Sequence, residues 1–575
     1  MIRGLRIAVL AKQVPAGGIV AMTDDGRVRR DGPAEINPFC RRAIAQGVIL
    51  ARETGGSCTV LTMGPPAAGE VLAEAIAWGA DHGVLVSDPA LAGADLQVTA
   101  AALTAALRAE GPFDVVLVGH SSVDAETGQL GQLVAGLLGW PFTGAARTLR
   151  MTGDGFEAGC EQDHQLVEVR VRPPVVIAVA ERLCDPAKAP GYPPTAVTTR
   201  DLSALPGALP AAASPTSVGP VRLVTPTRWR KVLRGPVEEQ AAAAVALLGD
   251  AGALRAGPSA ATRVVSSRGA AGPIVHVLSD PYHDSLAELL GLGARIGGEV
   301  HALCGPGPSA TLLAGQGADI VRRWAGSAPG PAATAAGLAT LGSAAVVLVP
   351  ATAWGREVAG RYAAATGAGL IADAIDVGQV GSTVRAQVCG FSGQGLLEIV
   401  SRTTPTVVTV RSGVLPLLSP RAHRSAVERP WRVPESPLDV AETARRTLDD
   451  WAALSRAEVV VGVGRGVAAA DHAALGPLLK VLDAQLAGTR KLTDAGVLPR
   501  SRQIGATGRS VRPRLYVAIG LSGRPHHLAG VTGSGTILAI NPDPDAPVFD
   551  AADVGIVATW QEAVPALVRA LSAAS

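Results

Sequence analysis

The chain has 575 residues, a length that normally divides into about three or four domains, because one hydrophobic core rarely supports so many residues. Apolar residues make up 48% of the chain and charged residues 17%, a composition typical of globular proteins that argues against a disordered chain. The 51 basic and 49 acidic residues give a net charge of +2, which argues against a surface that binds nucleic acid.

Neither a membrane span nor a metal framework can be read in the sequence. No uninterrupted apolar run reaches the roughly 18 residues that a span requires, and MIRGLRIAVLAKQV lacks the long apolar segment and cleavage site of a signal peptide. We therefore expect a cytoplasmic protein without an integral membrane span. The six cysteines form no CxxC pair, which argues against a zinc site or an iron–sulfur cluster and favours buried free thiols. They are Cys40, Cys58, Cys160, Cys184, Cys304 and Cys389.

Short β-branched segments alternate along the chain with alanine-rich segments of helical length. Continuous apolar strands separated by helices are typical of parallel sheets covered on both faces, so the pattern predicts an α/β fold. The expected strands are LRIAVLAK (5–12), SCTVLTMGP (57–65), FDVVLVGHS (113–121), PPVVIAVA (173–180), PIVHVLSD (273–280), EVHALCGPG (299–307) and AAVVLVPAT (344–352).

Two proline-rich segments interrupt this alternation and mark the expected domain boundaries, one at 183–220 and the other, RPWRVPESP, at 429–437. The two halves also share an order of elements. MGPPAAGEVLAEAIAWGAD (63–81) is echoed about 240 residues later by CGPGPSATLLAGQGAD (304–319). The sequence therefore predicts two similar α/β domains, followed by a third, unlike domain from about residue 431.

In the third domain, AEVVVGVGRGV (457–467) reads as a strand that enters a glycine-rich turn. The spacing is GxGxG rather than GxGxxG, so the dinucleotide fingerprint is weak and a purely structural turn is the alternative. Glycines nevertheless allow backbone N–H groups to approach a phosphate closely, and Arg465 could bind that phosphate through two hydrogen bonds.

The segments that follow resemble the C-terminal flavin domain of the electron transfer flavoprotein alpha subunit. The ordered series is TR (489–490), DAG (494–496), QIGATG (503–508), PRLYVAIGLSG (513–523), HLAG (527–530), AINPDPDAPVF (539–549) and ADVG (552–555). HVLSDPYHDSLAELLGLGARIGGEVHALCGPG (276–307) is similar to the N-terminal domain of the same subunit. The first half resembles the beta subunit in AVLAKQVP (8–15), INPFCRRA (36–43), AIAWGAD (75–81), DAETGQLGQ (124–132) and LGWP (138–141). The whole therefore resembles beta and alpha subunits fused in one chain.

This resemblance implies two similar parallel-sheet domains of the adenine-nucleotide-binding type and a C-terminal Rossmann-like FAD domain. The expected division is a beta-like domain at 1–200, a linker that could include the beta subunit's C-terminal arm at 201–270, an alpha N-terminal-like domain at 271–430, and the FAD-binding domain at 431–575. Because the subunits are fused, we expect a monomer equivalent to the usual heterodimer.

The resemblance also implies a function. It is that of an FAD-containing electron carrier, rather than a conventional enzyme, which accepts electrons from a flavoprotein dehydrogenase and passes them singly to a quinone-linked or other redox acceptor. Three alternatives stay open: a bifurcating type with a second FAD, a non-redox adenine-nucleotide-binding regulatory module, and a flavin enzyme that acts directly on a small substrate.

The resemblance assigns roles to individual residues. Arg490 would place a fixed charge beside the isoalloxazine ring, Thr507 would approach flavin N5, and His527 would lie near the N1/O2 edge, where charge accumulates on reduction. Backbone amides and hydroxyls would hold the ribityl and pyrophosphate groups. The full set expected at the FAD is Arg465, Thr489, Arg490, Gln503, Ile504, Gly505, Ala506, Thr507, Gly508, Ser522, Gly523, Arg524, Pro525, His526, His527, Asn541 and Thr559.

Three of these positions depart from the family. Ala506 and His526 stand where glutamine is usual, and Thr559 stands where an acidic residue is common. We therefore expect altered contacts to the flavin ring and the adenosine.

A second nucleotide site is implied in the beta-like half, at Asn37, Met63 and Gln129. Family members hold AMP or, in the bifurcating group, a second FAD there. NPFC favours AMP, whereas ETGQLGQ is also similar to the other group. A helix that begins after DAETG would direct its N-terminal amides toward a phosphate.

The partner surface is expected to differ from that of the family. DPAKAPGYPPTAVTTRDL (185–202) occupies the place of the segment that docks on acyl-CoA dehydrogenases. Tyr192 and the prolines around it cannot form the same helix, because proline removes N–H donors and stiffens the backbone. We therefore expect a different donor, such as another flavin-linked or quinone-linked dehydrogenase.

Overall fold

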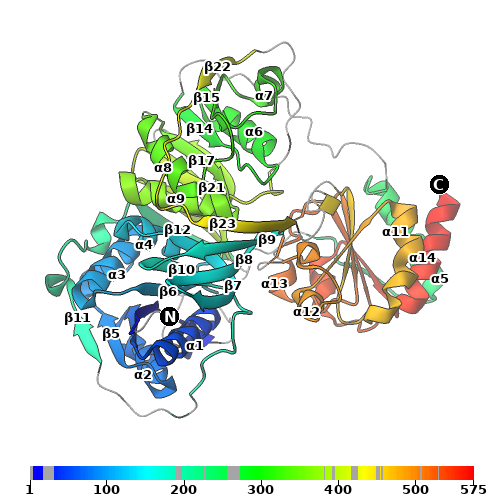
Figure 1. Cartoon of the computed structure of the whole chain (residues 1–575). Helices are drawn as coiled ribbons and strands as arrows, with labels where there is room; N and C mark the ends of the chain where they lie inside the picture. Colours follow the sequence, from blue (N-terminus) through cyan, green and yellow to red (C-terminus); the bar gives the residue numbers. More distant parts are fainter. Residues whose placement is uncertain are drawn as a thin grey trace.

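Three bodies, each built on its own large β-sheet, make up the protein (Figure 1). The computed structural model describes the chain except for residues 1–3, 17–31, 190, 192–196, 224–227, 255–271, 343, 381–382, 391–394, 416, 418–424, 448–452, 455–456, 506–507, 510, 529 and 575, and the side chains of 220, 222, 223, 380, 395, 525 and 526. None of the helices in the described part of the chain combines the length and apolar character that crossing a bilayer requires.

The first unit is a ten-stranded mixed sheet in the order β11-β5-β4-β1-β6-β10-β7-β8-β9-β23. The strands from β11 to β7 run parallel, and β8, β9 and β23 extend the sheet with antiparallel pairs. Its strands are β1 (Arg6–Leu10), β4 (Ser57–Met63), β5 (His82–Val86), β6 (Val115–Gly119), β7 (Phe142–Thr152), β8 (Gly155–Gln162), β9 (Gln165–Val171), β10 (Val175–Val179), β11 (Thr198–Arg200) and β23 (Ala441–Thr447). Its helices are α1 (Pro38–Thr54), α2 (Gly69–Trp78), α3 (Leu96–Glu110) and α4 (Leu130–Leu138), and β2 (Gln13–Pro15) pairs separately with β3 (Ala34–Ile36).

The second unit repeats this topology, because its strands follow the equivalent order β22-β16-β15-β14-β17-β21-β18-β19-β20-β12. The strands are β14 (Ile274–Leu278), β15 (Glu299–Cys304), β16 (Ile320–Arg323), β17 (Val346–Pro350), β18 (Gly369–Val380), β19 (Thr383–Gly390), β20 (Gly395–Ser401), β21 (Thr406–Val410), β22 (Val427–Pro430) and β12 (Thr216–Leu223). The helices are α6 (Leu286–Ile296), α7 (Ala310–Gln316), α8 (Pro331–Thr340) and α9 (Ala353–Thr366). The α/β prediction and the predicted repeat are thereby confirmed.

The seven strands expected from the sequence correspond to β1, β4, β6, β10, β14, β15 and β17. The antiparallel strands at one end of each sheet were not expected from the sequence. The reason lies in the burial pattern of strands such as β9, where buried and more exposed residues alternate. An antiparallel sheet can leave one face toward water and so lacks the continuous apolar signal of a parallel one.

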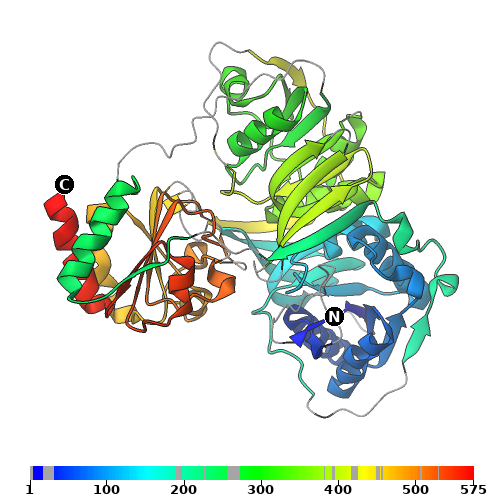
Figure 2. The same ribbon diagram turned by 180° about the vertical axis from the view of Figure 1, so that it is seen from behind.

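The two units exchange their edge strands. β12 follows β11 in the chain but pairs with β20 of the second sheet, with Thr216 opposite Ser401. β23 follows β22 but pairs with β9 of the first sheet, with Ala441 opposite Arg170 (Figures 1 and 2). Each unit thus covers an edge that would otherwise present unpaired backbone groups. Residues 441–447 lie with the first sheet, although the sequence division assigned them to the third domain.

Helices α4 and α9 hold the two units together at short range. A Cβ atom on Gly360 would lie 2.6 Å from Cβ of Gln132, and one on Gly136 would lie 2.7 Å from Cβ of Ala364. Arg361 also donates from two nitrogens to the carbonyl oxygen of Trp140, at 3.2 Å each. One buried apolar cluster contains side chains of both helices and continues into both sheets. The first and second units therefore share a core.

The third unit is a six-stranded sheet, all parallel, in the order β13-β28-β27-β26-β24-β25. Its strands are β13 (Lys231–Leu233), β24 (Val459–Val463), β25 (Gln485–Gly488), β26 (Leu515–Ile519), β27 (Thr536–Asn541) and β28 (Val554–Val557). Its helices are α5 (Val237–Asp250), α11 (Gly476–Leu482), α12 (Arg490–Asp494), α13 (Pro525–Leu528) and α14 (Trp560–Ala574).

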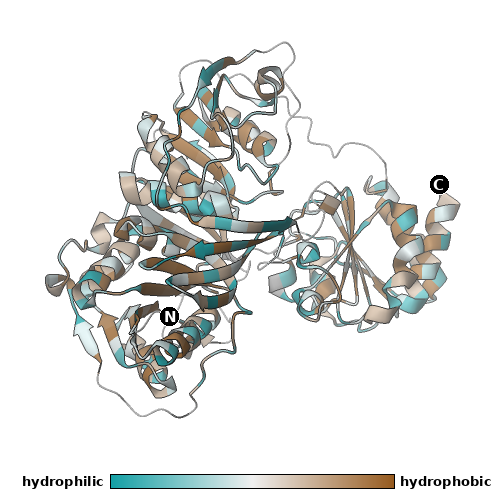
Figure 3. Ribbon diagram, in the orientation of Figure 1, coloured by the Kyte–Doolittle hydropathy of each residue, from teal (hydrophilic) through white to brown (hydrophobic). Residues whose placement is uncertain are grey.

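Part of the segment between the two repeats completes this third unit. β13 pairs with β28, and α5 lies beside α14, where apolar residues of both helices belong to one buried cluster; Figure 3 colours the hydrophobic residues brown. Gln240 of α5 bonds to both backbone groups of Val557, donating to its carbonyl at 3.2 Å and accepting from its N–H at 2.9 Å. β13 and α5 therefore precede the second unit in the chain but belong to the third unit.

We predict that Gly360→Ala destabilises the protein by about 1–3 kcal/mol, because the new methyl group would force α4 and α9 apart. Urea unfolding followed by circular dichroism measures this. The control is Gly249→Ala in α5, where an added Cβ meets nothing within 4 Å. That change should be neutral or stabilise by up to about 1 kcal/mol. Equal effects of the two substitutions would contradict the proposed close contact.

Candidate functional site

The residues expected at the FAD gather at the carboxyl edge of the third sheet. β24 is followed in the chain by β25 on one side of it and by β26 on the other, so the strand order reverses there. Open α/β sheets bind ligands in the crevice at such a switch point. The turns after β24 and β26 meet in this crevice, where a Cβ on Gly464 would lie 2.2 Å from the carbonyl oxygen of Gly520. One on Gly466 would lie 2.9 Å from Cα of Gly520, so these turns require glycine.

The other residues of the expected set stand on the same edge. Those that follow a strand are Arg465 after β24, Thr489 and Arg490 after β25, Ser522, Gly523 and Arg524 after β26, Asn541 at the end of β27, and Thr559 after β28. Arg465, Ser522, Arg524 and Thr559 are exposed. Within the described part of the chain, Arg465 and Arg524 have no side-chain partner, so two free cations flank the crevice.

Asn541 fixes the mouth of the crevice. Its amide nitrogen donates to the carbonyl oxygen of Leu521 at 2.9 Å, and its amide oxygen accepts from the Asp543 N–H at 2.9 Å. Gly523 has φ +77°, and a Cβ there would lie 2.2 Å from the backbone nitrogen of Val548. The turns after β26 and β27 are therefore locked together. Thr559 instead donates to Glu562 of α14 at 2.7 Å.

Backbone hydrogen bonds hold residues 503–505 and 508–509 beside this edge. The Arg509 N–H donates to the carbonyl oxygen of Gln503 at 2.8 Å, and the Ile504 N–H donates to that of Gly488 at 3.0 Å. Gln503 is fully buried and accepts a hydrogen bond from Thr493 at 2.7 Å. Gly505 has φ +135°, and a Cβ on Gly508 would lie 2.4 Å from the Gln503 carbonyl oxygen. Ala506 and Thr507 lie outside the described residues.

His527 is buried, and both of its ring nitrogens are engaged. Nδ1 lies 3.1 Å from the carbonyl oxygen of Ile504, and Nε2 lies 2.7 Å from the Tyr516 hydroxyl. A carbonyl can only accept, so Nδ1 carries the proton and Nε2 accepts from Tyr516. Burial lowers the pKa of His527 to about 4, so the imidazole is neutral at neutral pH. The side chains of its neighbours Pro525 and His526 lie outside the described residues.

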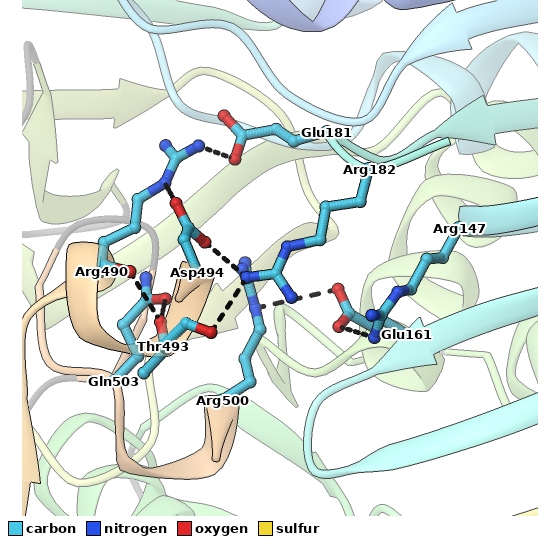
Figure 4. Close-up of polar contacts among 9 residues, drawn as sticks. All are labelled: Arg147, Glu161, Glu181, Arg182, Arg490, Thr493, Asp494, Arg500 and Gln503. Atoms are coloured by element: carbon cyan, nitrogen blue, oxygen red, sulfur yellow. Dashed lines mark hydrogen bonds and ion pairs between the residues drawn. The ribbon is translucent and has the colours of Figure 1, made fainter. Parts of the chain in front are cut away.

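Arg490 lies where the third unit meets the first. Its guanidinium contacts the Glu181 carboxylate, which follows β10, and also that of Asp494 in its own helix at 3.2 Å (Figure 4). Arg182 pairs with the other oxygen of Asp494 and donates to the Thr493 carbonyl at 3.4 Å. Asp494 therefore bridges two arginines that come from different units.

A second ion-pair group continues this contact. Arg500 of the third unit lies 3.8 Å from Glu161 on β8, and Arg147 on β7 lies 3.3 Å from the same carboxylate (Figure 4). The sequence analysis did not single out Glu161, Glu181 or Arg182. The available signal for the latter two was their place directly after a predicted strand.

The second expected site lies at the carboxyl edge of the first sheet, where β4 and β6 flank β1. Asn37 precedes α1, donates to the Ser121 carbonyl at 2.8 Å and accepts from the Val123 N–H at 3.2 Å. Met63 ends β4. Gln129 precedes α4 and is fully buried, yet neither its amide oxygen nor its amide nitrogen has a hydrogen-bond partner. A buried unpaired amide is unusual and indicates a place for a polar ligand.

We predict that the free energy of unfolding falls as the pH drops from 6.5 toward 4, because His527 is neutral when folded and binds a proton when unfolded. Its share is about 2–3 kcal/mol, present above pH 6.5 and lost below it. His120 and His276 act in the same direction, since burial also lowers their pKa values, to about 4 and about 3.

Urea unfolding at pH 7 and pH 5 measures this effect. His527→Gln should show a smaller loss between the two pH values than the unchanged protein, whereas the control His82→Gln, at an exposed position, should show the same loss. An unchanged loss in His527→Gln would contradict the assignment.

Comparison with known proteins gives the family of the chain. The model of the electron transfer flavoprotein domain matches residues 25–205 and 275–436, together more than half of the chain, and that of the electron transfer flavoprotein FAD-binding domain matches 453–532. The electron transfer flavoprotein subunit alpha of Mycobacterium leprae (strain TN) is 35% identical over 240 residues, 41% of this chain and 74% of that protein. Protein FixB of Azotobacter vinelandii is 33% identical over 315 residues, 50% of this chain and 86% of that protein. The chain therefore belongs to the electron transfer flavoprotein family and carries its FAD-binding domain.

Proposed function

We propose that this chain joins a beta-like and an alpha-like part of an electron transfer flavoprotein in one polypeptide. The support is that one domain model matches two separate segments, and that these form two sheets of the same strand order ahead of the FAD-binding domain. In this proposal the beta-like part is 1–200, the alpha-like N-terminal part is 271–430 and the FAD-binding part lies within 431–575, of which residues 441–447 pair with the first sheet. Residues 201–270 then supply β12 to the second unit and β13 and α5 to the third unit.

The FAD is proposed to lie at the switch point of the third sheet, in a Rossmann-like arrangement. The observation that carries this is the meeting of the glycine turns at Gly464–Gly466 and Gly520, which brings backbone to backbone where a pyrophosphate would approach. Arg465 and Arg524 would neutralise the charge of the pyrophosphate, and Ser522 would donate a hydrogen bond to it from its hydroxyl group. When bound, the FAD supplies the capacity to accept electrons and release them.

Two residues are given positioning roles. His527 connects the backbone of Ile504 to Tyr516 on β26, so it would hold Ile504 at a fixed distance from the sheet edge. Arg490 would present its charge toward the ring from a place fixed by Glu181 and Asp494. Because His527 is neutral at neutral pH, Arg490 is the one of these two residues that carries a positive charge.

As a carrier, the protein would accept electrons from a flavoprotein dehydrogenase and pass them one at a time to a quinone-linked or other acceptor. The contact of the third unit supports this. Its two apolar clusters contain only residues of that unit, including α5, whereas the described contacts with the first unit are mainly charged. A polar interface of this kind permits one domain to turn relative to another. Such turning would expose the FAD to successive partners.

The first unit is proposed to hold AMP rather than a second FAD. The unpaired amide of Gln129 and the loop held by Asn37 provide polar groups at the switch point of that sheet. A donor other than the usual acyl-CoA dehydrogenase is proposed from 185–202, of which Tyr192 and its neighbours at 190 and 193–196 lie outside the described residues.

The nucleotide content of the purified protein tests the two sites. We expect a flavin absorption spectrum and, after denaturation, one FAD and one AMP per chain by chromatography. Gly464→Ala should lower bound FAD at least about tenfold and leave AMP unchanged, whereas Gln129→Leu should do the reverse. The control is Gly476→Ala, where an added Cβ meets nothing within 4 Å. Two FAD per chain would overturn the AMP assignment, and a colourless protein would overturn the carrier.

The charged contact of the third unit gives a separate prediction. Arg182→Gln removes the partner of Asp494 from the first unit and should increase the average distance between the units, measured by energy transfer between dyes on the first and third units. Raising the salt concentration from about 0.05 to 0.5 M should do the same in the unchanged protein, because exposed ion pairs are screened. Arg170→Gln, which disrupts a pair with Glu157 within the first unit, is the control and should change nothing. Equal energy transfer in all three proteins would contradict the contact.

A further inference from the structure

The second unit contains a cleft at the carboxyl edge of its sheet. Cys304, at the end of β15, lines it as Met63 ends β4 in the first unit, but none of the described lining residues follows β17, the counterpart of β6. The cleft has a volume of about 560 Å³, within the range of small-molecule sites. It is formed by the turn after β14, the start of α6, and the turns after β15 and β16. These are the carboxyl ends of parallel strands, and the strand order reverses at β14 as it does at β1.

The frame of this cleft repeats that of the first unit with an aspartic acid in place of a lysine. Lys12 and Asp280 are each the second residue after the central strand. Lys12 bonds across to Asp124 in the loop after β6 at 2.7 Å, and Asp280 accepts from Thr352 in the loop after β17 at 2.5 Å. The same connection is therefore made with a lysine in the first unit and with an aspartic acid, whose pKa burial raises to about 7, in the second.

The lining of the cleft disfavours phosphate. Asp280 and Asp284 both line it, and among the described lining residues none is lysine or arginine. Arg323, nearby, donates to the carbonyl oxygens of Gly305 and Pro308, at 2.9 and 2.6 Å, so it holds the turn itself. Arg445 lies over the ring of Tyr282 at 3.7 Å from its centroid. A phosphate in this cleft would therefore lie beside two acidic side chains.

The same lining suits a neutral ligand with a planar apolar part and hydroxyl groups. Leu286, Leu312, Leu313 and Trp324 provide the apolar wall. Carboxylate oxygens accept hydrogen bonds, and in dinucleotide sites an acidic residue binds the ribose hydroxyls in this way.

Ser285 adds an unpaired polar group beside the cleft. It lies between two lining residues and immediately precedes α6, as Asn37 precedes α1. Asn37 uses its side chain to hold the neighbouring loop, but the Ser285 hydroxyl, in a residue that is 4% exposed, has no hydrogen-bond partner. A buried hydroxyl in this state is one that a ligand or a bound water would satisfy.

We propose that the cleft of the second unit binds an uncharged nucleoside, with its base against the apolar wall and its sugar hydroxyls donating to the carboxylates. The cleft lies at the carboxyl edge of the second sheet, whereas the FAD is expected at that of the third sheet and the other nucleotide at that of the first.

Equilibrium dialysis of the full-length, flavin-loaded protein with radiolabelled adenosine tests the proposal, in the presence of saturating AMP to occupy the first unit. Guanosine, cytidine and uridine are tested in the same way. We expect saturable binding of one nucleoside per chain that excess AMP does not displace. Absence of saturable binding for all four nucleosides, or full displacement by AMP, would overturn the proposal.

Two variants locate the binding. Ala328 is exposed and lines the cleft, so Ala328→Trp should lower the affinity at least about tenfold by filling the space. Ala325→Trp is the matched control, since Ala325 is exposed on the same turn but does not line the cleft, and its affinity should not change. FAD content and thermal unfolding, measured in both variants, show that the fold is intact. Equal affinities in the two variants would place the nucleoside elsewhere and overturn the assignment.

Discussion

The close approach of α4 and α9 is the contact on which the rest of the structure depends. Gly136 and Gly360 bring the two helix backbones together, and this lets side chains of both repeats enter one apolar cluster. With the two sheets fixed in this way, each can supply an edge strand to the other. β12 and β23 reach their partner strands because the distance between the sheets does not change. The first and second units therefore form one rigid base, whereas a looser helix contact would leave both edges open.

The third unit contacts this base through a different kind of interaction. Its apolar residues are used internally, and its described side-chain contacts with the first unit are mainly charge pairs such as Arg182 with Asp494. Apolar burial is strong and is not weakened by electrostatic screening, whereas partly exposed ion pairs contribute little and are screened. The base can stay assembled while the FAD-binding unit changes its position. A carrier that must meet a donor and an acceptor in turn needs this difference between its interfaces.

The sequence predicted what depends on local pattern and left out what depends on distant pairing. Continuous apolar runs located the parallel strands, and motif order brought Arg465, Thr489 and Asn541 to one sheet edge, because residues that follow parallel strands always meet there. β12 gave a weak signal, since an edge strand tolerates the Gly219–Pro220 pair within it. Arg490 pairs with Glu181 of a different unit, and a local sequence pattern does not predict such a pair. His527 was expected near the flavin N1/O2 edge, but its burial and its hydrogen bond with Tyr516 are set by packing.

The duplicated units show how one frame can be given two chemistries. A parallel sheet with a reversal of strand order creates a cleft whatever the side chains are, so both repeats inherit one. What distinguishes them is the residue two places beyond the central strand, Lys12 in one and Asp280 in the other. Each makes the bond that holds two loops together, so the exchange of side chain leaves the frame intact. Duplication therefore preserves the strand order, while exchanges such as Asp280 for Lys12 and Ser285 for Asn37 change the polar groups beside the cleft, which is why a repeat of the fold need not be a repeat of the ligand.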